Sequence, residues 1–358
     1  MTEQHRPQLA IVGATGAVGQ VLLDVLPTRP DIWGGLRLAA GPEDVGQVCR
    51  VARSSYAVEA LSPSFFAAVD IALFDIPPEV TSEWVEVAVS QGVLAVDNST
   101  AYRNDPDVPL VVPEVNSSAI YNMRRQIVAT PGATVMTMID VLGALHAGWQ
   151  LEELVLTVFQ AASGRGRRGM TRLYDEVALV AGNRMLGQRP GDVRRLVDAE
   201  LPESVFPGPL ALNILPMVGQ PLPSGWTTEE QKVRSEIRKV LGIPSLKVAT
   251  TCVRVPVVSS HSVSIHARFA RPITVDRARQ ALIEAPMVVV LDDPEHDEFP
   301  TPADVVGADP RFAGRIRQSL DLPNSIDLFV VGDNLRKGSA LNMLQVAELL
   351  APHVDTLR

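Results

Sequence analysis

Residues 8–26 read QLAIVGATGAVGQVLLDVL, and this stretch decides the fold of the first part of the chain. Its first residues, which are mostly apolar, predict a buried strand, and the amphipathic segment after the turn predicts a helix. Between them, Gly13, Gly16 and Gly19 have the spacing G-x-x-G-x-x-G. Small residues let the backbone approach a pyrophosphate, and a helix N-terminus favours its charge. The stretch therefore predicts a dinucleotide-binding turn.

The strand pattern continues through the next hundred residues. Strand-like runs follow as LRLAA, DIALFDI, GVLAVDNS and QIVATP, with helical patterns between several of them. Strands that alternate with helices indicate a parallel sheet with helices on its faces. We therefore predict an α/β fold, with a Rossmann-like doubly wound domain over roughly the first 130 residues.

The pattern changes after residue 132. MTMIDVLGALHAGW predicts a helix and LEELVLTVFQAAS begins a strand, whereas the Pro-rich stretch 205–226 cannot be regular for long. TTEEQKVRSEIRKVLG predicts a helix that Thr228 can cap and Gly242 can close. LKVATTCVRVPVVSSHSVSIHARFA predicts long strands broken near Pro256. Runs of strands with separate helices favour an α+β second domain.

Composition and charge restrict the class of protein. The chain has 358 residues and a formal net charge of −9, which argues against nucleic acid as the main partner. Its two cysteines, Cys49 and Cys252, lie far apart without metal-ligand spacing, so we expect no metal and a reduced environment. We see no signal peptide and no apolar run long enough to span a bilayer. We therefore expect a cytoplasmic protein with no membrane partner.

Residues 127–143, IVATPGATVMTMIDVLG, predict a second strand–turn–helix corner. The first N–H groups of a helix favour negative charge and lower the pKa of a thiol, so such a corner suits a nucleophilic cysteine. This corner carries Gly132, Ala133 and Thr134 instead. The sequence therefore predicts the geometry of a nucleophile site without the nucleophile.

Seven stretches, in this order and at these intervals, make the chain resemble bacterial aspartate-semialdehyde dehydrogenases from end to end: GATGAVG, DNSTAYRNDPDVPLVVPEVN, FQAASGRGRRG, TTEEQK, CVRVPVVSSHS, DDPEHDEFPTPADVVG and VVGDNLRKGSALN. The resemblance implies a dinucleotide domain over residues 1–132, completed by a C-terminal helix over residues 335–356. It implies a substrate-binding and dimerisation domain over residues 133–334, and a homodimer.

The resemblance also implies a reaction and the residues that perform it. In the family a cysteine thiolate attacks the acyl phosphate of β-aspartyl phosphate, NADPH reduces the resulting thioester, and a histidine moves the protons. The residues of this chain that match family positions are His261 (acid–base), Gln160 (substrate orientation), Arg254 (α-carboxylate), Glu230 (amino group), and Arg103 with Lys232 (phosphate). The resemblance implies NADP or NAD as cofactor, held by Gly13, Thr15, Gly16, Ala17, Val18, Gly19 and Asn334.

The sequence departs from the family pattern at the nucleophile. Ala133 stands where the family has cysteine, and a methyl group cannot form a thioester. Thr134 lies one residue away, and its hydroxyl is scarcely ionised without a paired base. Cys252 shares a predicted strand face with Arg254 and is better read as a small buried residue.

Further departures lie in the expected cofactor site. Asp75, Pro77 and Pro78 replace small residues, so the loop has a negative charge and fewer N–H donors. Glu43 and Asp44 follow the second strand, where negative charge would repel a 2′-phosphate. Arg165, Arg167 and Arg168 add bulk and positive charge in FQAASGRGRRG, which favours an anion.

Three hypotheses follow from this pattern. The first is a non-catalytic paralogue that keeps the substrate-side site for a small dicarboxylate or phosphate. The second is an active NAD(P)-dependent aldehyde or semialdehyde oxidoreductase of amino-acid biosynthesis that uses His261 without a covalent cysteine step. The third is a structural subunit paired with a true dehydrogenase. Because the substrate-side residues remain while the nucleophile is absent, the sequence favours the first hypothesis.

Overall fold

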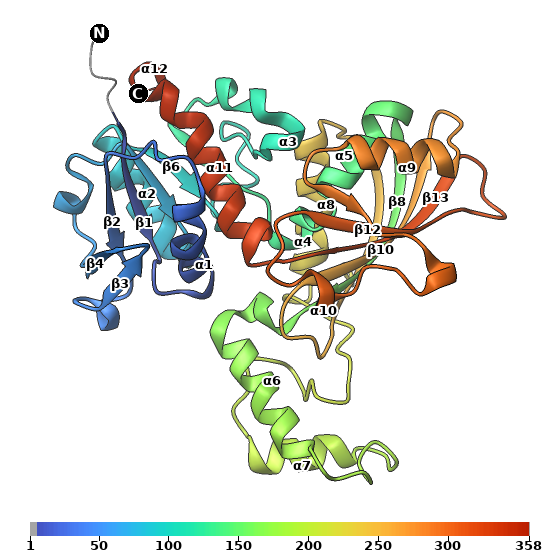
Figure 1. The fold of residues 1–358 in the computed structure, drawn as a ribbon. Helices are drawn as coiled ribbons and strands as arrows, with labels where there is room; N and C mark the ends of the chain where they lie inside the picture. The colour runs from blue at the N-terminus through green and yellow to red at the C-terminus, as the bar shows by residue number, and fades with distance from the viewer. Residues whose placement is uncertain (1–5, 358) are drawn as a thin grey trace. The chain divides into compact units, whose positions relative to one another are not determined.

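The computed structural model describes residues 6–357 and divides into two compact units. Unit 1 contains the described residues up to Met136, Ser235–Ile243 and the chain from Leu335 onward. Unit 2 contains Thr137–Arg234 and Pro244–Asn334. Each unit has its own β-sheet (Figure 1).

The sheet of unit 1 confirms the predicted doubly wound α/β domain. Its strand order is β3-β4-β2-β1-β5-β6-β7, and neighbouring strands are parallel except for the antiparallel pair β3–β4. The chain thus moves outward from β1 in both directions, which places the strand-to-helix turns at the carboxyl edge of the sheet. The strands are β1 (Gln8–Val12), β2 (Gly35–Ala39), β3 (Val48–Val51), β4 (Ser54–Glu59), β5 (Ile71–Phe74), β6 (Leu94–Asp97) and β7 (Ile127–Ala129).

Unit 1 also contains helices, which include α1 (Ala17–Val25), α2 (Pro78–Ser90), α3 (Pro113–Asn116), α4 (Ala133–Met136), α11 (Leu341–Leu350) and α12 (Val354–Leu357). Of these, α1, α2 and α11 contact strands of this sheet. The C-terminal helix α11, red in Figure 1, contacts β5, β6 and α1. Its apolar residues, which include Leu344, Val346 and Leu350, are fully buried. The two ends of the chain therefore build one hydrophobic core.

The sheet of unit 2 is mixed, as an α+β domain requires. Its strand order is β11-β12-β13-β10-β8-β9, with parallel pairs at both edges and antiparallel pairs between them. The strands are β8 (Leu151–Gln160), β9 (Lys247–Arg254), β10 (His261–Phe269), β11 (Val288–Val290), β12 (Arg311–Gln318) and β13 (Ser325–Gly332). Helices α5 (Ile139–Trp149) and α9 (Val275–Glu284) contact each other and this sheet (Figure 1). The strands predicted on either side of Pro256 are β9 and β10.

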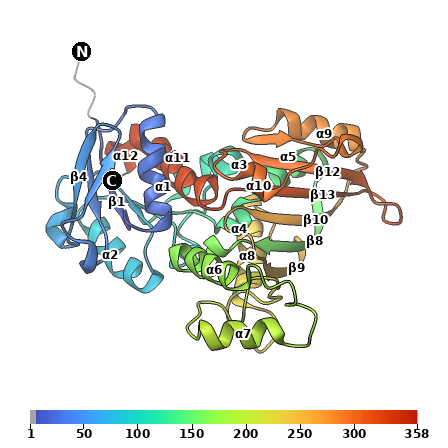
Figure 2. The same cartoon turned by 60° about the horizontal axis from the view of Figure 1, so that its bottom comes forward.

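The remaining helices are α6 (Gly166–Val180), α7 (Asp192–Glu200), α8 (Thr228–Leu241) and α10 (Pro302–Val305). Helices α6 and α7 lie next to each other in both views (Figures 1 and 2). The Pro-rich stretch after α7 is ordered by a buried carboxylate. Glu176 pairs with Arg172 at 2.6 Å and accepts hydrogen bonds from the backbone N–H groups of Leu210 (2.6 Å) and Ala211 (2.9 Å).

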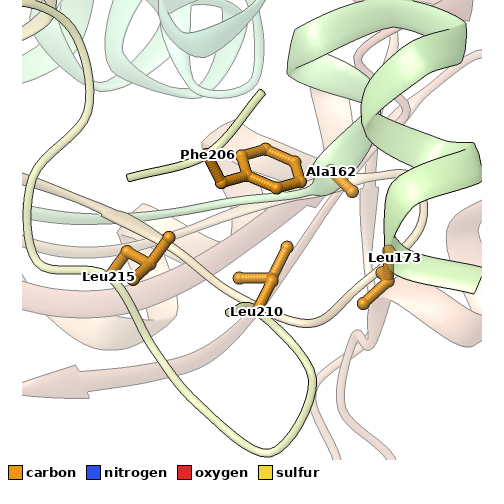
Figure 3. Close-up of a cluster of buried hydrophobic side chains, with 5 residues drawn as sticks. All are labelled: Ala162, Leu173, Phe206, Leu210 and Leu215. Atoms are coloured by element: carbon orange, nitrogen blue, oxygen red, sulfur yellow. The ribbon is translucent and has the colours of Figure 1, made fainter. Parts of the chain in front are cut away.

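A small apolar cluster fixes the same stretch from the inside. Figure 3 shows its buried side chains, which come from the loop after β8, from α6 and from the Pro-rich stretch: Ala162, Leu173, Phe206, Leu210 and Leu215. This packing holds Phe206 beside the end of β9. The same stretch is also tied to β9 by two backbone hydrogen bonds of 2.8 and 2.9 Å between Leu215 and Arg254. The irregular segment is therefore a fixed wall of the site described below.

The corner at residues 127–143 differs from its prediction in one respect. The expected single helix is divided into the four-residue helix α4 and the longer helix α5, which begins at Ile139. Only the short helix follows the Pro-Gly turn directly, so the helix dipole at Ala133 is weaker than a long helix would provide. Across residues 6–357, no helix combines the length and the apolar character needed to cross a membrane.

Candidate functional site

The glycine turn of unit 1 is packed tightly against its own backbone. Gly13 has φ +100°, and a Cβ atom there would lie 2.3 Å from the carbonyl oxygen of Asp75. A Cβ atom on Gly19 would lie 2.2 Å from the carbonyl oxygen of Gly13. Gly16 is the N-cap residue of α1, whose first two residues are Ala17 and Val18. Folding alone therefore requires glycine at positions 13 and 19.

Acidic side chains surround the end of β2 next to this turn. The hydroxyl of Thr15 donates a 2.6 Å hydrogen bond to Asp44. The carboxylate of Glu43 bends over Gly41, where a Cβ atom would lie 2.5 Å from it. Two negative charges at this place disfavour a 2′-phosphate.

A chain of hydrogen bonds crosses the carboxyl ends of β5, β6 and β7. Asp75 accepts from Asn98 at 2.8 Å, and Asn98 accepts from the hydroxyl of Thr130 at 2.7 Å. Burial raises the pKa of Asp75, against the opposing effect of the Asn98 hydrogen bond. Burial also raises the pKa of the neighbouring Asp97. Asp75, which departs from the family pattern, is thus held in this hydrogen-bond chain.

The prolines of the same loop begin helix α2. Pro77 is its N-cap residue and Pro78 its first residue, a position that proline tolerates well. Neither residue has a backbone N–H, so this helix start offers fewer donors to a phosphate than one without prolines.

The corner around Ala133 is occupied by an ion pair of unit 1. Arg103 Nη1 lies 3.1 Å from Glu236 Oε1, and both side chains are at least 92% buried. The other oxygen of Glu236 accepts a 2.7 Å hydrogen bond from Gly132 N. A Cβ atom on Gly132 would lie 2.7 Å from Arg103 Nη1. The guanidinium predicted to bind phosphate therefore fills the space that a side chain at position 132 would need.

Lys239 fixes the loop that carries Arg103. Its ammonium donates to the carbonyl oxygens of Arg103 (2.9 Å), Asp105 (2.7 Å) and Val108 (2.8 Å). Sequence inspection gave no role to Lys239 or to Glu236, because each acts on residues more than a hundred positions away.

The substrate-side residues of unit 2 form a cluster at the carboxyl ends of β8 and β9. Gln160, the last residue of β8, donates a 2.9 Å hydrogen bond to Glu229 Oε1. Lys232 Nζ lies 3.0 Å from Glu229 Oε2. Register places Gln160 directly opposite Arg254 on β9. Two of the predicted positions, Gln160 and Lys232, therefore contact one carboxylate, and a third, Arg254, lies beside Gln160.

That carboxylate belongs to Glu229 and not to the predicted Glu230. Glu230 accepts from Thr227 N at 2.9 Å, its own N–H donates to Thr227 Oγ1 at 3.2 Å, and its other oxygen accepts from Cys252 N at 3.1 Å. This reciprocal pair is a capping box, so Thr227, and not the predicted Thr228, caps α8. The sequence pattern Thr227-x-x-Glu230 is typical of this capping box and was overlooked in the sequence analysis.

Arg254 is a buried cation at the end of β9. Only 4% of it is exposed, and its Nη1 donates a 2.7 Å hydrogen bond to the carbonyl oxygen of Ala161. Its guanidinium carbon lies 6.0 Å from the centre of the Phe206 ring. Burial lowers its pKa to about 10, the charge of Glu229 opposes this shift, and the charge of Arg165 adds to it. Among residues 6–357, it has no carboxylate within ion-pair distance.

His261 begins β10 and is 2% exposed. Its Nδ1 accepts a 3.2 Å hydrogen bond from the N–H of Ala161, which leaves the proton of the neutral ring on Nε2. Burial and then the charge of Arg254 lower its pKa to about 3. In the unliganded unit, His261 is therefore a neutral imidazole with its proton on Nε2 and a weak tendency to take up a second one.

Gly164 brings the loop after β8 against both side chains. A Cβ atom on Gly164 would lie 2.5 Å from Arg254 Nη1 and 3.5 Å from His261 Cε1. Asn334, predicted to bind the dinucleotide, holds this loop in unit 2. Its Oδ1 accepts from Ser163 Oγ at 2.9 Å and from Ser260 N at 3.0 Å.

The other possible nucleophiles fit catalysis poorly. Burial and then the charges of Glu229 and Glu230 raise the pKa of the Cys252 thiol. Thr134 is buried in α4. Within the described part of the chain, no group of three His, Cys, Asp or Glu side chains is arranged to hold a metal ion.

Comparisons with known proteins agree with this arrangement. The family model described as "Semialdehyde dehydrogenase, NAD binding domain" matches residues 8–123, and that of the "Semialdehyde dehydrogenase, dimerisation domain" matches residues 142–337. An aspartate-semialdehyde dehydrogenase of Streptomyces akiyoshiensis is 41% identical over 347 residues, 96% of this chain and 98% of the relative.

Solved structures give the same result. The structure of aspartate semialdehyde dehydrogenase II from Vibrio cholerae complexed with ASA has a TM-score of 0.88 at 32% identity, covering 97% of this chain and 99% of that one. A probable aspartate-semialdehyde dehydrogenase from Pseudomonas aeruginosa has a TM-score of 0.86 at 28% identity, covering 98% and 99%. The chain therefore belongs to the aspartate-semialdehyde dehydrogenase family.

Proposed function

We propose that this chain is a non-catalytic aspartate-semialdehyde dehydrogenase homologue that keeps the substrate-side site for a small anion. The observation that carries the proposal is Ala133 at the corner after β7, where the family resemblance calls for the nucleophilic cysteine. A methyl group cannot form the thioester on which hydride transfer depends. The buried thiol of Cys252, with its raised pKa, offers no substitute.

The substrate side supports retained binding. Arg254 presents a planar fork suited to a carboxylate, and Gln160, Glu229 and Lys232 are joined by hydrogen bonds and an ion pair beside it. We propose that Glu229, in place of Glu230, faces an amino group of the ligand. We propose that Arg103 contacts a phosphate only when its ion pair with Glu236 is broken.

The match to an NAD binding domain supports a nucleotide site in unit 1. We propose that this site prefers NAD to NADP, because Asp44 and Glu43 lie beside the glycine turn. Within unit 1, we propose Thr15 and the start of α1 as contacts of this nucleotide.

A second candidate is an NAD-dependent oxidoreductase that works without a covalent intermediate. The retained His261 supports it, because oxidation of an alcohol or an aldehyde hydrate requires a residue that moves a proton, although burial and the charge of Arg254 make the resting imidazole a weak base. The match to a dimerisation domain supports a homodimer built through unit 2 for either candidate.

The experiment that separates them uses protein expressed in a host without its own aspartate-semialdehyde dehydrogenase. Phosphate-dependent oxidation of aspartate semialdehyde with NADP or NAD is expected to be absent. Nucleotides and dicarboxylates are then tested for thermal stabilisation, which a ligand of the native state must produce. Turnover above the background of a mock purification would refute the non-catalytic assignment.

A further inference from the structure

A cavity of about 260 Å³ lies within unit 2 beside the substrate-side cluster. Its wall includes two arginines, Arg165 and Arg254, one from the loop after β8 and one from the end of β9. Much of the rest of the wall is apolar and includes Phe206, Leu215 and Val218. A pocket with apolar walls and two cations is complementary to a ligand with an aliphatic middle and two negative ends.

Arg254 has no direct ion-pair partner in the unliganded unit, although the charge of the nearby Glu229 acts on it. The side chain is buried, its guanidinium donates to the carbonyl oxygen of Ala161, and no carboxylate of residues 6–357 pairs with it. A buried charge without a direct ion-pair partner is costly, so an anion that reaches it gains more than one at the surface. This observation is independent of the cavity and indicates the sign of the ligand.

Arg165 adds a second positive charge to the same wall. It is exposed, and among the residues described it forms no ion pair. Two guanidinium groups that line one small cavity repel each other, and an anion placed between them relieves that repulsion. The family resemblance calls for a small residue here, so the second cation is a property of this chain.

We propose that this cavity binds a small aliphatic dicarboxylate, with one carboxylate on Arg254 and the other on Arg165. The proposal rests on the proposed function and deepens it, because it names the ligand class of the substrate-side site. Phosphate satisfies the charges without using the apolar wall, whereas a four- or five-carbon dicarboxylate uses both. Arg165 is thus a specificity-determining residue.

Isothermal titration of the full chain with succinate, glutarate, propionate and inorganic phosphate tests this assignment. We expect succinate or glutarate to bind at least roughly tenfold more tightly than propionate, since a charge-assisted hydrogen bond contributes about that factor. Arg165→Gln is expected to remove this difference and to leave propionate binding unchanged. Arg168→Gln is the matched control, because Arg168 is exposed on α6, which begins directly after Arg165, but does not line the cavity.

Three results would overturn the proposal. They are an Arg165→Gln variant that binds dicarboxylates as the unmodified chain does, an equal loss in Arg168→Gln, and phosphate binding as tight as succinate binding. Each leaves the non-catalytic assignment standing, because that assignment fails only on measured turnover. If no anion binds, both the cavity assignment and the retained anion site are refuted. The non-catalytic assignment is unaffected by that result, because it depends on the missing nucleophile.

Discussion

Glu236 accepts a 2.7 Å hydrogen bond from the backbone N–H of Gly132, the residue directly before Ala133. The same carboxylate pairs with Arg103, whose guanidinium lies where a side chain at position 132 would begin. The N–H group at the start of a corner is the group that would face an incoming anion. In this chain it already has an internal partner.

Ala133→Cys tests the electrostatics of the corner. Position 133 already has a Cβ atom, so the new thiol adds one sulfur without displacing Arg103. The guanidinium and the start of α4 favour the thiolate, so we expect a thiol pKa below the reference of about 8.5. The new thiol should react with iodoacetamide at neutral pH faster than Cys49 or Cys252, both of which are buried.

Peptide mass spectrometry across a pH series gives the alkylation rate of each cysteine in one sample. A pKa at or above the reference would show that Glu236 and the shortness of α4 outweigh Arg103. We expect little dehydrogenase activity from this single change, because the cofactor loop still carries Pro77 and Pro78.

His261 predicts a pH dependence of stability. The unfolded imidazole binds a proton below about pH 6.5, whereas the folded one stays neutral down to about pH 3. The unfolded state therefore binds more protons between these values, and the free energy of unfolding falls as the pH falls from 6.5 toward 3. His261→Asn, whose Oδ1 can still accept from Ala161 N, should show a shallower decline. Urea unfolding between pH 4.5 and pH 7.5 measures it, and parallel curves for the two proteins would contradict the buried neutral histidine.

Gly164→Ala should impair anion binding more than stability. The added methyl would lie 2.5 Å from Arg254 Nη1, so the guanidinium must move away from its place beside Ala161. We expect succinate affinity to fall roughly tenfold, with a small change in the free energy of unfolding. Gly148→Ala on α5 is the control, because a Cβ atom at that position would have no neighbouring atom within 4 Å. Equal affinities for the two variants would place the ligand elsewhere.

Asp44→Asn tests the choice of nucleotide. The asparagine can still accept from Thr15, but the negative charge is gone. NADP should bind the unmodified chain more weakly than NAD does, and the substitution should strengthen NADP binding selectively. Calorimetry with both nucleotides measures the ratio. A low micromolar dissociation constant for NADP with the unmodified chain, about −8 kcal/mol, would show that the acidic turn tolerates a 2′-phosphate.

Val155→Glu should convert a dimer to a monomer. Val155 lies on β8 with 47% of its surface exposed, on the sheet face that also carries the tilted pair Phe159 and Phe329. A charge introduced into an apolar interface is expensive to desolvate. Light scattering should show half the mass of the unmodified protein, while Leu320→Glu, at a 98% exposed position, should not change it. A concentration-independent monomer for the unmodified chain would remove the dimer altogether.

The parts of the structure that sequence reasoning recovered are those with a local signal. Periodicity and turn residues located β1, β2, β5, β6 and β7 of unit 1 and the break near Pro256, but not the strands β3 and β4. Glu229 was missed because Thr227-x-x-Glu230 is a capping pattern that removes Glu230 from the site. Glu236 was missed because its partner Gly132 lies 104 residues away, and no local pattern encodes such a contact.

Because of the close packing around Gly13 and Gly19, the fold requires the glycine turn whether or not the turn binds a nucleotide. Either residue, if given a side chain, would collide with backbone atoms of the turn or of the end of β5, so the fold itself would suffer. Selection for stability alone is then sufficient to retain the motif in a lineage that no longer needs a nucleotide. Surveys that infer dehydrogenase activity from this fingerprint alone will therefore also count any homologue in which the glycines are kept for the fold.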